Sequence, residues 1–183
     1  PTVDAALEEL GKHGVQAMGG VPPRVVPDLG DDAREYSAVQ PGFGLVYLNN
    51  DSVLFSEAAV RKALSLATDR TAIATDPSLL GGQGQASASP IPTGSWAYWA
   101  DHDRIAFDPA AARSLLEQEG WIDGDGDGIR DRDGKPLRFR LGTSSEPVMQ
   151  AIAEKLALDW RTIGADPEIE TLDQQATMRS LSA

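Results

Sequence analysis

With 183 residues, of which 41% are hydrophobic, the chain can bury a full core as one globular domain. Its formal net charge of −12 argues against nucleic acid or an anionic membrane surface as a partner, because both bind basic surfaces. The absence of cysteine excludes disulfides and thiol chemistry, and no stretch is apolar for long enough to cross a bilayer.

The N-terminal part combines one helical pattern with three strand patterns. A short helix is predicted from Thr2, a good capping residue, to Gly11, because the apolar residues between them recur every three or four positions. A brief buried strand is predicted at 15–18 and another strand at 35–39. Residues 43–49 carry apolar side chains on both faces of a strand pattern, so we expect a strand that is covered on both sides.

The next part contains two helices and a long loop. A helix is predicted at Ser56–Thr68 with Ser56 as its cap, and Asp69 is expected to cap a short helical turn. The apolar stripe of the longer helix consists of Val60, Ala63, Leu64 and Ala67. Residues 75–99 form a loop that contains Trp96 and Trp99, and loops of this length are usually functional. Its aromatic side chains either line a ligand surface or anchor the loop to the core, and the sequence leaves both interpretations open.

Residues 107–141 contain a helix, an acidic loop and a strand. Asp108 and Pro109 are typical of a helix start, because the carboxylate accepts hydrogen bonds from free amides and proline needs none at the first position. Gly120 ends this helix. Apolar residues alternate with arginines over Leu137–Leu141, which predicts a strand with one buried face.

The acidic loop has aspartate at nearly every second position. Asp123, Asp125 and Asp127 precede Gly128 in the D-x-D-x-D-G pattern of calcium-binding loops, in which alternating carboxylates supply oxygen ligands. The predicted ligands are the side chains of Asp123, Asp125, Asp127 and Asp131 and the backbone carbonyl of Ile129. The second half of an EF-hand is missing, and the loop resembles more closely the calcium loops of thrombospondin repeats. The alternative is a polar turn whose aspartates face water.

The C-terminal part contains the longest helix, predicted at 146–163, and a last strand at 168–172, followed by a helical tail from Gln174. Because strands and helices alternate, we expect one α/β domain over residues 1–183 with parallel strands, in which helices pack on a small sheet that contains residues 43–49 and 137–141. Residues expected in its core are Leu64, Leu116 and Leu156.

No catalytic constellation is recognisable in the sequence. The two histidines, His13 and His102, lie far apart and near predicted turns, which favours solvated side chains. A nucleophile elbow, a dinucleotide-binding fingerprint and a phosphate-binding loop are all absent from the sequence. We therefore predict that the protein is not an enzyme.

Five sequence blocks occur together and in order. They are GGVPPRVVP at 19–27, YLNN at 47–50, VRKALSLATDRTAI at 60–73, SPIPTGSWAY at 89–98 and FDPAAARSLLEQEGW at 107–121. In this arrangement the chain resembles the extracellular solute-binding proteins of ABC importers for peptides and nickel, the dipeptide- and oligopeptide-binding family. The region 75–85 departs from the family pattern, and the chain stops before a tryptophan- and aspartate-containing segment with which family members contact their ligand.

The resemblance implies a periplasmic-binding-protein-like fold of two hinged lobes, with this chain forming most of the second lobe and the remainder of the protein missing. A peptide or similar small solute would be held between the lobes and delivered to membrane permease subunits, outside the cytoplasm. The candidate ligand contacts are Tyr47, Asn49, Trp96 and Trp99. No cofactor is required, and calcium is the only one that the sequence suggests. The alternative function, based on the acidic loop alone, is a calcium-stabilised extracellular adhesion or interaction module.

Overall fold

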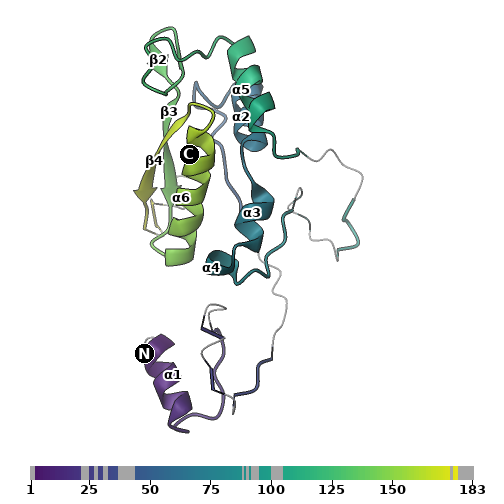
Figure 1. Cartoon of the computed structure of the whole chain (residues 1–183), viewed down its shortest axis with the longest axis vertical. Coiled ribbons are helices and arrows are strands. Elements are labelled where there is room, and N and C mark those ends of the chain that lie inside the picture. Colours follow the sequence, from purple (N-terminus) through teal and green to yellow (C-terminus); the bar gives the residue numbers. More distant parts are fainter. Residues whose placement is uncertain are drawn as a thin grey trace.

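The computed structural model describes residues 3–21, 25–26, 29–30, 33–36, 44–87, 89, 91, 95–99, 105–173 and 175–176. Its helices are α1 (Val3–Gly11), α2 (Ala58–Leu66), α3 (Arg70–Thr75), α4 (Pro77–Leu80), α5 (Pro109–Gln118) and α6 (Pro147–Arg161). Its strands are β1 (Asp131–Arg132), β2 (Lys135–Pro136), β3 (Arg138–Thr143) and β4 (Asp166–Thr171). The N-terminal helix α1 lies at one end of the structure, apart from the helices and strands that follow (Figure 1).

Strands β3 and β4 form a parallel pair that α6 connects. The register runs from Arg138 opposite Asp166 to Thr143 opposite Thr171, and α6 packs against both strands (Figure 1). The predicted alternation of strand, helix and parallel strand is confirmed. The last strand begins at Asp166, two residues earlier than predicted, because Gly164 adopts the left-handed conformation that ends the helix and lets the chain turn at once.

The core lies between α2, α5, α6 and the inner face of β3. All four residues of the predicted α2 stripe are buried, and so are Leu64, Leu116 and Leu156, as predicted. Trp160 is 2% exposed, and its indole Nε1 donates hydrogen bonds to the Leu64 carbonyl (3.1 Å) and the Thr68 hydroxyl (3.0 Å). Its ring also contacts Phe139 of β3, with 5.7 Å between centroids. One side chain therefore joins α6 to α2 and to the sheet.

Of the predicted helix caps, two are confirmed and one is wrong, and Thr2 lies outside the described residues. The Asp69 carboxylate accepts a hydrogen bond from the Ala72 amide, and the Asp108 carboxylate accepts one from the Ala111 amide, each at 2.8 Å. Ser56 does not cap α2, because its hydroxyl donates to the Val53 carbonyl in the preceding turn. Glu57 holds the cap position instead, without a side-chain hydrogen bond to the helix.

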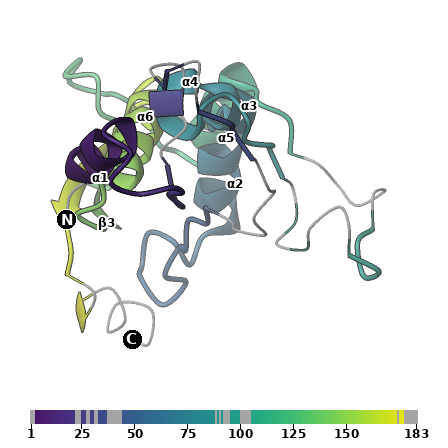
Figure 2. The same ribbon diagram turned by 90° about the horizontal axis from the view of Figure 1, so that it is seen from below.

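The predicted strands of the N-terminal part are not found among the described residues. Residues 44–49 form no strand, and Leu45 and Tyr47 are 49% and 68% exposed, so the expected cover on both faces is wrong. The reason is physical, because a strand needs a hydrogen-bonding neighbour and neither described sheet provides one for this segment. It forms a loop that projects beyond α2 (Figure 2).

Four smaller expectations concern the segments around 15–18 and 35–39, the long loop and the C-terminal tail. Residues 15–18 form no buried strand, since Val15 is exposed. Glu35 and Tyr36 are exposed and are not in a strand, and the rest of the segment 35–39 lies outside the described residues. The long loop contains the unpredicted helix α4, which starts where Asp76 accepts a hydrogen bond from the Ser78 amide. Of the predicted C-terminal helical tail, only residues 175–176 are described, and they are helical.

Candidate functional site

The four predicted ligand contacts lie on two separate segments. Tyr47 and Asn49 precede α2, whereas Trp96 and Trp99 belong to the loop between α4 and α5. Figures 1 and 2 both draw the 95–99 segment well apart from α2 and the segment before it. The structure therefore does not bring the two pairs of residues together.

Tyr47 is exposed on a segment whose neighbours are held to the core. Leu48, Leu54 and Phe55 are partly buried against the core, and the Phe55 ring meets Phe139 edge-on, with 5.1 Å between centroids. The Asn49 side-chain oxygen accepts a hydrogen bond from the Asp51 amide at 2.9 Å, which starts the turn between these anchors. The arrangement presents the phenol of Tyr47 to the outside while fixing its position along the chain.

Trp96 and Trp99 are presented differently. Trp96 is 98% exposed and Trp99 is 66% exposed. A turn sets their spacing, since the Ser95 carbonyl accepts a hydrogen bond from the Tyr98 amide at 3.0 Å. Of the two interpretations of this loop, anchoring to the core is wrong for Trp96, because an anchor would bury its ring. An indole this exposed is a surface group, available to stack on a bound molecule.

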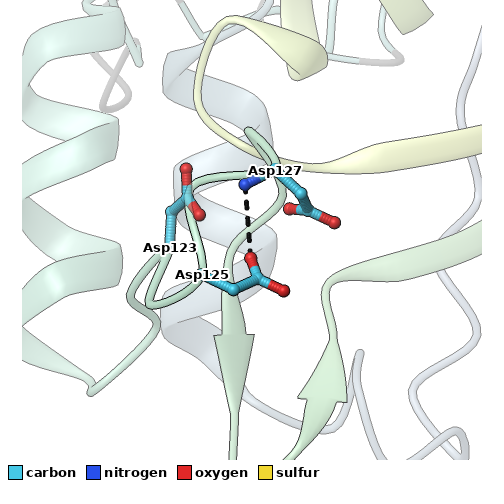
Figure 3. A group of neighbouring side chains, drawn as sticks. All are labelled: Asp123, Asp125 and Asp127. Carbon is cyan, nitrogen blue, oxygen red and sulfur yellow. Dashed lines mark hydrogen bonds between the residues drawn. The ribbon is translucent and has the colours of Figure 1, made fainter.

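The acidic loop, residues 123–133, brings three of its aspartates together. Carboxylate oxygens of Asp123, Asp125 and Asp127 all lie within 4.8 Å of one another, and the three side chains are exposed (Figure 3). Asp131 is outside this group, because it belongs to β1 and pairs there with Ile122 through backbone hydrogen bonds. The structure thus groups three of the four predicted carboxylate ligands.

The same carboxylates already organise the backbone of the loop. Asp123 accepts hydrogen bonds from the amides of Gly126 (2.8 Å) and Gly128 (3.0 Å). Asp127 accepts one from the Ile129 amide at 2.7 Å, and Asp125 accepts one from the Asp127 amide at 3.2 Å (Figure 3). Because an ionised carboxylate has about four acceptor positions, each keeps capacity for a cation. The geometry is compatible with both earlier interpretations, the calcium site and the polar turn.

Arg130 and Arg132 alternate with aspartates at the end of the acidic loop and attach the loop to the helices. We call this pair of residues the arginine clasp. Arg130 is 9% exposed, and its guanidinium donates to the carbonyls of Ile163 (2.9 Å) and Trp121 (2.7 Å). It also pairs with the Glu117 carboxylate at 2.8 Å. The positive charge of Arg130 is favourable at this place, because the two carbonyls that accept from it follow the C-terminal ends of α5 and α6.

The second arginine of the clasp connects the loop to α2. Arg132 pairs with the Glu57 carboxylate, donates to the Glu119 carbonyl at 3.0 Å, and lies over the Trp121 ring with 4.6 Å to its centroid. The hydrogen bond with Glu57 raises the pKa of the Arg132 guanidinium. The sequence analysis did not predict the arginine clasp, because hydropathy treats both arginines as surface residues. The only signal that could have separated them from other arginines is their position within the acidic loop.

The outer face of the sheet is charged, as its alternating pattern predicted. Arg138 pairs with Asp166 at 2.6 Å, and Arg140 pairs with Glu170 at 3.2 Å, both across the two strands. The hydrogen bond with Asp166 raises the pKa of Arg138.

No helix among the described residues is long and apolar enough to cross a membrane.

The chain belongs to the family described as bacterial extracellular solute-binding proteins, family 5, whose middle region matches residues 1–182. The family resemblance predicted from the sequence blocks is thereby confirmed. The family assignment favours the class of solute-binding proteins over the alternative of an adhesion module.

Individual relatives agree with this assignment. Over 137 residues the chain is 31% identical to the oligopeptide-binding protein AppA of Bacillus subtilis (strain 168), covering 73% of this chain and 25% of that protein. It is 32% identical over 123 residues to the nickel-binding periplasmic protein of Escherichia coli (strain K12), covering 67% and 23%. The chain thus spans about a quarter of the length of these relatives.

A solved structure extends the likeness to three dimensions. The structure of AppA from Bacillus subtilis in complex with a nonapeptide matches with a TM-score of 0.75 at 26% sequence identity. The match covers 98% of this chain and 36% of AppA. The predicted fold class, an α/β part of a periplasmic-binding-protein-like structure, is confirmed.

Proposed function

We propose that the protein is the substrate-binding component of an ABC importer, which captures a peptide or a related small solute and delivers it to a membrane permease. The observation that carries this proposal is the family match along residues 1–182. The relatives that support a peptide are the oligopeptide-binding protein of Bacillus subtilis and its nonapeptide complex. The nickel-binding relative keeps a metal chelate as the second class of cargo to be tested.

The exposed aromatic and amide groups suit such a cargo. The rings of Tyr47, Trp96 and Trp99 offer flat apolar faces, which can stack on side chains of varied sequence. The Asn49 side chain offers both a donor and an acceptor to a peptide backbone. A binding protein for many peptides needs this combination, since shape and backbone contacts tolerate different side chains.

The same proposal includes a location and a mode of action. The family consists of extracellular solute-binding proteins, so we place this protein outside the cytoplasm, where it would meet the permease at the membrane. It would act by binding and release without chemical change of the solute. Calcium, if the acidic loop binds it, would stabilise the fold and would not be part of the cargo.

Titration calorimetry on the intact protein and on this chain tests the proposal. The intact protein should bind short peptides with a dissociation constant of roughly micromolar or below, because two lobes can enclose the ligand. This chain alone should bind the same peptides weakly or not at all, because it supplies one wall of the cleft. Failure of the intact protein to bind any member of a panel of peptides, sugars and nickel chelates would reject the importer function.

Two substitutions in the intact protein then test the predicted contacts. Trp96→Ala and Tyr47→Ala should each weaken peptide binding by roughly tenfold, the effect of losing about 1.4 kcal/mol. Val53→Ala is a matched control, because Val53 is also exposed, at 78%, and is not among the proposed contacts. Equal affinities for all three variants and the unchanged protein would reject these residues as contacts and leave the importer proposal intact.

A further inference from the structure

We draw no further inference here: the strongest candidate, the set of exposed apolar side chains Leu45, Val46, Tyr47 and Val53 on the segment before α2, carries nothing because the described part of the chain shows no partner that covers them.

Discussion

Two leucines illustrate how differently the two parts of this chain are organised. Leu64 in α2 is 2% exposed, whereas Leu45, in the segment that precedes α2, is 49% exposed. Both belong to apolar patterns from which burial was predicted. Leu64 is covered because α5 packs against its helix and Trp160 of α6 belongs to the same core. Leu45 is not covered, since no described strand lies beside its segment.

This difference separates local from non-local requirements of secondary structure. A helix satisfies its backbone hydrogen bonds within itself and needs only one apolar face to be covered. A strand needs a second strand before it exists at all. In the part from α2 to β4, the core residues of α2, α5, α6 and β3 cover one another. We therefore expect this part to respond strongly to changes in its core and the preceding segment to respond weakly.

The largest effect is expected from Leu156→Ala in α6. Leu156 is 6% exposed in the core, and removing its side chain should lower the free energy of unfolding by about 2–5 kcal/mol. Leu158→Ala is a matched control on the same helix, because Leu158 is 60% exposed, and its cost should stay near or below about 0.5 kcal/mol. Denaturant unfolding of both variants measures the difference. Equal costs would contradict the packing of α6 on the sheet.

A somewhat smaller effect is expected from Arg130→Ala in the arginine clasp. The substitution leaves the carbonyls of Ile163 and Trp121 without their donor, which should cost about 1–3 kcal/mol in unfolding free energy. Arg138→Ala on the outer sheet face is the control, and its effect should be much smaller, because exposed ion pairs contribute little. If Arg138→Ala were the more damaging of the two, the clasp would not hold the acidic loop.

Features that depend on residues close in the sequence could be predicted, and features that depend on distant residues could not. Asp69, Asp108 and the α2 stripe were correctly assigned, because caps and helical periodicity act within a few residues. The parallel pairing of β3 and β4 followed from the alternation of elements. The clasp of Arg130 and Arg132 was missed, since burial of a charged side chain depends on acceptors that converge only in the folded chain.

The candidate site was harder to predict than the fold. The sequence offered Trp96 and Tyr47 as candidate contacts but no spatial relation between the two segments that carry them, which Figure 1 draws well apart. A side chain can be assigned to ligand binding only together with the other residues that contact the same ligand. A chain that spans about a quarter of its relatives' length supplies only part of that information.

A modest effect is expected from calcium. If Asp123, Asp125 and Asp127 bind the ion, calcium at ten times its dissociation constant should stabilise the fold by about 1.4 kcal/mol and raise the melting temperature by a few degrees. The double variant Asp125→Asn and Asp127→Asn should lose this rise, and magnesium in place of calcium should produce less of it. Identical melting curves with millimolar calcium and with a chelator would leave the polar turn as the correct interpretation.

Amide hydrogen exchange, followed by mass spectrometry on this chain and on the intact protein, tests most directly whether the segment before α2 needs partners from outside this chain. In this chain, amides at 45–49 should exchange fast, while those of β3 and α6 should be protected by their hydrogen bonds. Under the proposed function, the remainder of the intact protein would add a neighbour to this segment, so residues 45–49 should become protected there as well. Protection of 45–49 equal to that of β3 in this chain alone, or fast exchange there in both proteins, would contradict the account.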